Sequence, residues 1–195
     1  DLKTAKILAR KMIDTFESAG VDYVVLNSAG CGSFMKEYHH LLADDPQYAE
    51  ISKTFINKVK DVSEILVEHG WQPSDIPLNI SVTYDEPCHL VHAQQVSSQP
   101  RELINGIKGI NFIELSESTW CCGSAGIYNI THYEDSMGFL SRKMEKISST
   151  GAEYVVTGNP GCMIQLMYGA KKFGYNVKVL HPITLLRRSY QSDSL

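Results

Sequence analysis

The stretch from Gly151 to Cys162, GAEYVVTGNPGC, has the pattern of a buried strand that runs into a tight turn and ends in a cysteine. Tyrosine and valine favour strands, and the Gly-Asn-Pro-Gly run after them favours a turn. The pattern also occurs from Gly20 to Cys31 as GVDYVVLNSAGC, with six of the twelve positions identical. A helical stretch follows each copy, at residues 34–42 and 163–173. The chain therefore contains a repeated strand–turn–helix unit.

The repeat divides the chain into two unequal parts. VSEIL, from Val62, resembles PITLL, from Pro182, and we expect each to begin a helix. If residues 76–195 form a complete unit, residues 1–75 contain only the C-terminal half of an equivalent one. The sequence opens directly into an amphipathic helix at Asp1. We therefore expect the remaining elements of the first unit to lie upstream.

Hydrophobic periodicity predicts the other elements. Apolar residues at positions 51, 55, 59, 62 and 66 have helical spacing, and alternation at positions 80, 82 and 84 predicts a strand. We further expect helices at 100–107 and 137–147 and strands at 112–115, 154–157 and 177–180. From residue 80 the order is β-α-β-α-β-α-β-α. It predicts an α/β fold, with a Rossmann-like parallel sheet flanked by helices.

Composition and charge narrow the class of protein. The chain has 195 residues, 43% of them hydrophobic, so it can bury a core without disulfides. A net charge of −4, with mostly dispersed lysines and arginines, argues against nucleic-acid binding. No apolar run approaches the roughly 18 residues of a membrane span, and no signal-peptide pattern opens the chain. We expect a cytoplasmic protein.

Four of the five cysteines follow predicted strands. Cys88 follows the strand near residue 80, Cys121 and Cys122 follow the strand near residue 112, and Cys162 follows the repeated strand. Because the carboxyl ends of parallel strands meet at one edge of a sheet, we expect these four thiols to converge. An odd number of cysteines in a chain of this size favours metal or redox chemistry over a disulfide framework.

Four converging thiolates suit either of two metal centres. A [4Fe–4S] cluster and a tetrahedral zinc ion both take four cysteine ligands, and the spacing does not distinguish them. The fifth cysteine, Cys31, is interpreted as a small packing residue, because the cysteines that would accompany it are absent from the chain. His89, beside Cys88, is a candidate hydrogen-bond donor to a ligand sulfur.

The spacing of these cysteines resembles that of the cysteine-rich CCG domain family. The matching motifs are PCHL at residues 87–90, CCG at residues 121–123 and NPGC at residues 159–162. The resemblance implies Cys88, Cys121, Cys122 and Cys162 as metal ligands. Members of this family usually carry two CCG domains in tandem, which agrees with one complete unit preceded by half of another.

Four longer stretches carry a narrower resemblance: NSAGCGSFMKEYHHLLADDPQYAE at residues 27–50, DEPCHLVHAQQVSSQPRELI at 85–104, ESTWCCGSAGIYNI at 117–130 and VVTGNPGCMIQL at 155–166. In these stretches the chain resembles the C-terminal part of glycolate oxidase iron–sulfur subunits. That resemblance implies an electron-transfer subunit with a [4Fe–4S] cluster, which takes electrons from flavin-containing subunits and passes them toward quinone. The chain would then be part of an oxidoreductase for 2-hydroxy acids rather than a complete catalyst. It would reach a membrane surface only through the complex.

Three alternatives remain open from the sequence. Lactate-utilisation proteins share the architecture. Heterodisulfide reductases also contain CCG domains, but the fullest pattern ends in C-x-x-C, and here the last position is Gln165. Four thiolates fit a cubane cluster or zinc better than a five-ligand cluster. The third alternative is a structural four-cysteine zinc site in an interaction module.

Overall fold

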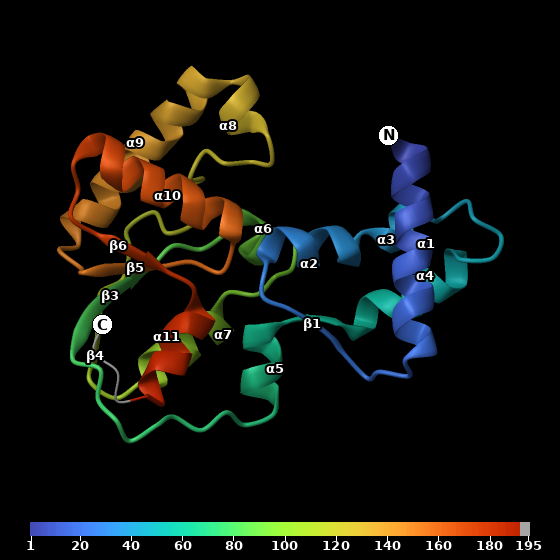
Figure 1. Ribbon diagram of the computed structural model, residues 1–195, viewed down its shortest axis with the longest axis horizontal. Helices are drawn as coiled ribbons and strands as arrows, with labels where there is room; N and C mark the ends of the chain where they lie inside the picture. The colour runs from blue at the N-terminus through green and yellow to red at the C-terminus, as the bar shows by residue number, and fades with distance from the viewer. Residues whose placement is uncertain (192–195) are drawn as a thin grey trace.

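The computed structural model describes residues 1–191 and contains two parallel sheets with helices packed around them (Figure 1). The strands are β1 (Val24–Leu26), β2 (Val59–Asp61), β3 (Ile80–Tyr84), β4 (Ile110–Phe112), β5 (Tyr154–Val156) and β6 (Lys178–Leu180). The helices are α1 (Leu2–Ser18), α2 (Ala29–Lys36), α3 (Tyr38–Leu41), α4 (Ala49–Lys58), α5 (Val62–Glu68), α6 (Cys88–Val91), α7 (Ser98–Gly106), α8 (Tyr128–Thr131), α9 (Tyr133–Ser149), α10 (Pro160–Phe173) and α11 (Pro182–Ser189).

The larger sheet has four parallel strands in the order β4-β3-β5-β6. Val82 at its centre pairs with Phe112 on one side and with Tyr154 on the other. At one edge, Val156 of β5 pairs with Leu180 of β6. The predicted α/β fold with a parallel sheet is therefore confirmed. Among residues 1–191, every helix is too short or too polar to cross a membrane.

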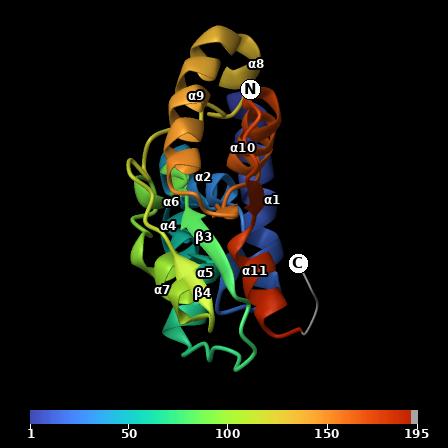
Figure 2. The same ribbon diagram turned by 90° about the vertical axis from the view of Figure 1, so that its left-hand side faces the viewer.

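Helices cover both faces of this sheet, because side chains alternate along each strand. Tyr154 and Val156 of β5 pack into one core with α7 and α11. Val155, between them, points to the other face and packs into a second core with α9 and α10. Figures 1 and 2 show α8 and α9 extending beyond the sheet at one end of the molecule. Because these three buried residues point alternately to the two faces, β5 packs against helices on both sides of the sheet.

The smaller sheet consists of β1 and β2, which pair in parallel from Val24–Val59 to Leu26–Asp61. A separate core surrounds it, with Ile13 of α1 and Phe55 of α4 fully buried. In Figure 1, α1 and α4 lie on the side of the molecule away from the four-stranded sheet, and α2 lies between them and that sheet. The two repeated strands therefore belong to different sheets.

Two predicted elements differ from the structure. The helix expected over residues 51–66 is broken by β2, because Val59 pairs with Val24 and Asp61 caps the next helix. The Asp61 side chain accepts the Ser63 N–H, and Glu64 accepts the Asp61 N–H, which is a capping box. The strand expected at 112–115 is β4 at Ile110–Phe112, since the chain leaves the sheet after Phe112.

Candidate metal centre

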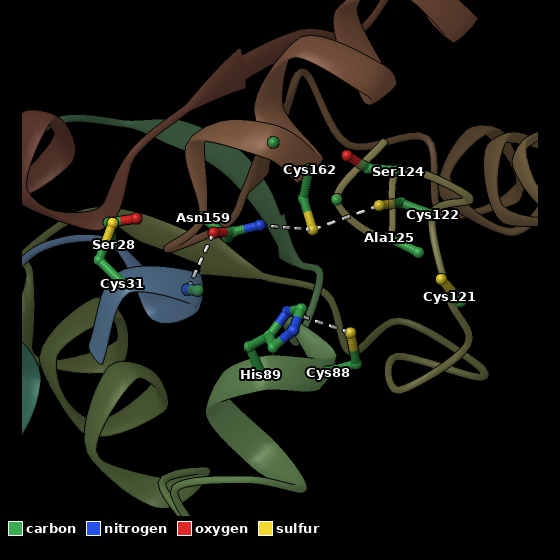
Figure 3. A pocket seen from close by; sticks show the side chains of 13 residues that line it. Ser28, Cys31, Cys88, His89, Cys121, Cys122, Ser124, Ala125, Asn159 and Cys162 are labelled. Atoms are coloured by element: carbon green, nitrogen blue, oxygen red, sulfur yellow. Dashed lines mark hydrogen bonds between the residues drawn. The ribbon is translucent and has the colours of Figure 1, made fainter. Parts of the chain in front are cut away.

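All five cysteines line one pocket of about 250 Å³ at the carboxyl ends of β1, β3 and β5 (Figure 3). The four predicted ligands, Cys88, Cys121, Cys122 and Cys162, are brought together as expected from the parallel topology. Each of the five is a free thiol. The other residues that line the pocket are Ser28, Gly30, His89, Ser124, Ala125, Gly126, Asn159 and Gly161.

The cysteines reach the pocket from helix starts as well as from a loop. Cys88 is the first residue of α6, and Cys162 lies in the first turn of α10, which has Pro160 at its N-terminus. Cys121 and Cys122 lie in the loop between β4 and α8. All four therefore follow strands as predicted, but Cys88 and Cys162 lie at the starts of helices and not in loops. First-turn amides of α10 are left free by the helix, so its start is electropositive.

Cys31 also lines this pocket, contrary to its interpretation as a buried packing residue. It is exposed and lies in the first turn of α2, as Cys162 lies in the first turn of α10. The repeat contains the signal for this placement, because Cys31 and Cys162 occupy the same position in the two copies. The pocket is thus formed by both parts of the chain.

The sulfur atoms differ in their distances and burial. The Sγ atoms of Cys122 and Cys162 are 3.2 Å apart, and both residues are only 4% exposed. Cys88 and Cys121 are partly exposed. The Cys88 Sγ lies 3.8 Å from Nδ1 of His89, so His89 is in reach of that sulfur as the sequence suggested. The pocket therefore has a buried pair of sulfurs and a more open pair.

The thiols around Cys121 favour its charged form. The neighbouring thiols of Cys122 and Cys88 lower the pKa of the Cys121 thiol to about 2. Its sulfur also accepts the Gly123 N–H at 3.3 Å. The proximity of Cys121, with burial, raises the pKa of Cys88 and of Cys122. Because thiolates rather than thiols bind metals, the lowered pKa of Cys121 is consistent with its proposed role as a ligand.

The donor set suits either a multi-iron cluster or a single zinc ion. Four cysteine thiolates are the usual ligands of a [4Fe–4S] cluster and also of a structural zinc ion. Around a zinc ion with Zn–S bonds of ~2.3 Å, four sulfurs would lie about 3.8 Å apart. The Sγ atoms of Cys122 and Cys162, at 3.2 Å, are near that spacing, and all four sulfurs line a pocket of about 250 Å³. The chemistry of the four thiols therefore fits the cluster that the sequence predicts, and metal analysis distinguishes it from zinc.

A chain of hydrogen bonds holds the CCG turn against the helices behind it. Ser136 of α9 donates to the carbonyl oxygen of Gly123 at 2.9 Å, and Gln165 of α10 donates to Ser136 at 3.0 Å. Asn129 of α8 donates to Gln165 at 3.0 Å. Gln165 is only 3% exposed. The residue at the fifth-cysteine position therefore supports the turn through its amide.

Replacing Gly123 with alanine is expected to destabilise the fold. Gly123 has φ +86°, and a Cβ there would lie 2.5 Å from the carbonyl oxygen of Ser136. Gly126 has φ +68°, but its Cβ would meet open space. Both substitutions carry the cost of a left-handed residue, so the clash should make Gly123→Ala worse by about 1–3 kcal/mol. Denaturant unfolding of the two variants measures the difference, and equal stabilities would contradict it.

The two acidic residues before Cys88 form ion pairs, one buried and one partly buried. Asp85 pairs with Lys143 at 2.8 Å, and Glu86 pairs with Arg101 at 2.7 Å. The Lys143 side chain is 0% exposed, and its Nζ also donates to the carbonyl oxygens of residues 117 and 118 at 3.1 and 2.9 Å. Sequence reasoning missed Lys143, since nothing in an amphipathic helix pattern marks a lysine as buried. This pair fixes the end of β3 to the segment that leads to the CCG turn.

Comparison with known proteins agrees with this geometry. The model of the CCG cysteine-rich domain matches residues 1–36 and 82–167. The chain is 44% identical over 178 residues to the "Probable glycolate oxidase iron-sulfur subunit" of Bacillus subtilis, covering 90% of this chain and 40% of that protein. It is 32% identical to lactate utilization protein A of Oceanobacillus iheyensis, covering 95% of this chain and 75% of that protein.

The B. subtilis lactate utilization protein A is 30% identical, with 91% of this chain and 74% of that protein covered. The chain thus spans less than half of the first relative and about three quarters of the other two. The family model matches both the repeated strand–turn–helix motif and the segment with the other four cysteines. The chain therefore belongs to the CCG cysteine-rich domain family.

Proposed function

We propose that this chain is an electron-transfer part of an iron–sulfur subunit in a complex that oxidises a 2-hydroxy acid. The proposed ligands are Cys88, Cys121, Cys122 and Cys162, and the proposed cofactor is a [4Fe–4S] cluster. When bound, such a cluster supplies one-electron transfer, and the protein tunes its potential through burial and hydrogen bonds. The observation that carries the proposal is the single pocket of about 250 Å³ that these four thiols share.

Glycolate is the proposed substrate of the whole complex. The support is the 44% identity to a relative named as a glycolate oxidase iron-sulfur subunit, against 32% and 30% for the two lactate utilization proteins. An iron–sulfur subunit implies other subunits. We propose that a flavin-containing subunit oxidises the acid and that this chain carries the electrons onward toward quinone.

The residue at position 165 favours electron transfer over the cleavage of disulfides. In the fullest CCG pattern a fifth cysteine stands at this position, and here Gln165 is buried with both ends of its amide hydrogen-bonded to Ser136 and Asn129. The complete unit therefore supplies four thiolates. The fifth thiol of the pocket, Cys31, comes from the other part of the chain and is exposed, so we leave it outside the proposed ligand set.

We also propose that residues 1–75 correspond to the C-terminal half of a CCG unit and that residues 76–195 form a complete one. The order β1-α2, then β2-α5, matches β5-α10, then β6-α11. In both parts the two strands are parallel neighbours. In both, the first strand is followed by a helix with a cysteine in its first turn.

The proposed function is tested by the metal content of the chain purified without oxygen. We expect about four irons and four acid-labile sulfides per chain, with a broad visible absorption band. One zinc ion per chain in a colourless protein would contradict the redox role and support a structural metal site instead. Measuring iron, sulfide and zinc on the same sample separates the two results.

A further inference from the structure

The side chain of Asn159 connects a predicted ligand sulfur to the other part of the chain. Asn159 is the N-cap residue of α10, but its side chain does not cap that helix. Its Nδ2 lies 3.4 Å from the Sγ of Cys162, and its Oδ1 accepts the Gly30 N–H at 3.2 Å (Figure 3). One amide group therefore contacts both Cys162 and the first turn of α2.

The contact with Gly30 fixes which end of the amide faces the sulfur. The Gly30 N–H is a donor, so the Asn159 oxygen must face it, and the NH₂ group then points to Cys162. The neighbouring amide of α2, Ala29 N–H, donates to the carbonyl oxygen of Gly158 at 3.1 Å. The start of α2 thus holds residues 158 and 159 in place, and the donor to the sulfur is preorganised.

A donor in this position changes the electronic properties of the sulfur. Hydrogen bonds to a ligand thiolate draw negative charge away from the metal and stabilise the more negative, reduced state of a cluster. Cys162 is 4% exposed, so water does not readily replace a lost donor. Its buried neighbour Cys122, 3.2 Å away, adds charge that the same donor offsets once both are thiolates.

We propose that Asn159 is a positioning residue that raises the reduction potential of the metal centre by donating a hydrogen bond to Cys162 while α2 holds its amide. This inference rests on the proposed function, because it requires a redox cofactor on Cys162. It also gives residues 1–75 a role in the metal centre, because the Gly30 N–H orients the Asn159 amide that donates to Cys162.

The test is the midpoint potential of Asn159→Leu and Asn159→Asp, followed by visible absorbance in a potentiometric titration. Leucine removes both contacts of Asn159. Aspartate keeps an acceptor for the Gly30 N–H but removes the donor to Cys162 and adds negative charge. Both variants should have a lower potential than the wild type. At the wild-type midpoint we expect the ratio of reduced to oxidised cluster to fall about tenfold, which is ~59 mV for a one-electron couple.

The matched control is Ser28→Ala. Ser28 occupies the position of Asn159 in the other copy of the repeat and lines the same pocket. Its side chain makes no hydrogen bond within residues 1–191, so its removal should leave the potential unchanged. An equal shift in Ser28→Ala would show a general effect of the pocket wall and overturn the inference.

The outcomes separate this inference from the proposed function. Iron and sulfide are measured first in the wild type, and their absence would overturn both. A cluster-bearing wild type with an unshifted Asn159→Asp variant would overturn the role of Asn159 alone. If Asn159→Leu loses the cluster through misfolding, Asn159→Asp is compared with Ser28→Asp, which adds the same charge to the pocket wall without removing a donor to Cys162. A larger fall in potential for Asn159→Asp supports the inference, and an equal fall overturns it.

Discussion

The chain with Cys121→Ser is expected to lose its iron and sulfide together with its visible absorption. Cys121 carries the thiolate that the other cysteines and the Gly123 N–H stabilise, and its pKa is lowered to about 2. A serine hydroxyl at this position is not ionised near neutral pH and is a poor ligand for iron. Removal of a residue that merely supports a metal ligand costs roughly 10- to 100-fold in affinity, and removal of the ligand itself should cost at least as much.

The control for this experiment is Cys31→Ser. Cys31 lines the same pocket but is exposed and lies outside the proposed ligand set. We expect Cys31→Ser to keep the iron, sulfide and absorbance of the wild type, measured side by side with Cys121→Ser after anaerobic purification. Retention of full metal content by Cys121→Ser would show that the ligand set is wrong. Loss of metal in Cys31→Ser would add Cys31 to it.

The sequence predicted the larger sheet well because its strands carry strong local signals. Ile80, Val82 and Tyr84 alternate, and the structure places β3 at Ile80–Tyr84. The run from Tyr154 to Val156 is buried on both faces, which fits a central parallel strand. The parallel direction of these strands follows from the alternation of strands and helices. Their order was not predicted, because nothing local shows that β5 pairs with β3 rather than with β4.

The smaller sheet was harder to predict, because β2 has no strand pattern of its own and forms only by pairing with β1. Val59 continues the helical spacing of the segment before it, and only its pairing with Val24 makes it part of β2. The Asp61–Glu64 capping box was a readable sign that a new helix begins there. At Val59, pairing with a residue 35 positions away in the sequence therefore determines the secondary structure, and the local helical periodicity does not.

The candidate site was predicted in part. Convergence of Cys88, Cys121, Cys122 and Cys162 followed from the topology alone. The position of Cys31 and the role of Asn159 did not, because both depend on how the two parts of the chain pack together. That packing is set by contacts such as Ala29 N–H to Gly158, which no local pattern encodes.

The second large effect is expected for Lys143→Met, which should lower the melting temperature by about 6–20 °C. The variant leaves Asp85, with a side chain 2% exposed, without its partner at 2.8 Å. It also removes one of the two donors to the carbonyl oxygens of Glu117 and Ser118, which keep the N–H groups of Trp120 and Glu86. Removing one partner of a buried pair costs about 3–5 kcal/mol, and in a chain of this size each kcal/mol is worth roughly 2–4 °C.

The matched control is Lys146→Met on the same helix. Lys146 pairs with Glu117 at 3.4 Å, but its side chain is 38% exposed, so its loss should cost less than about 1 kcal/mol. The double variant Lys143→Met with Asp85→Asn removes the orphaned charge and should regain part of the stability, since the new amide oxygen can still accept the Thr157 hydroxyl that donates to Asp85 at 3.0 Å. Thermal unfolding by circular dichroism at matched metal content measures all three. Equal melting temperatures for Lys143→Met and Lys146→Met would show that the buried pair contributes no more than an exposed one.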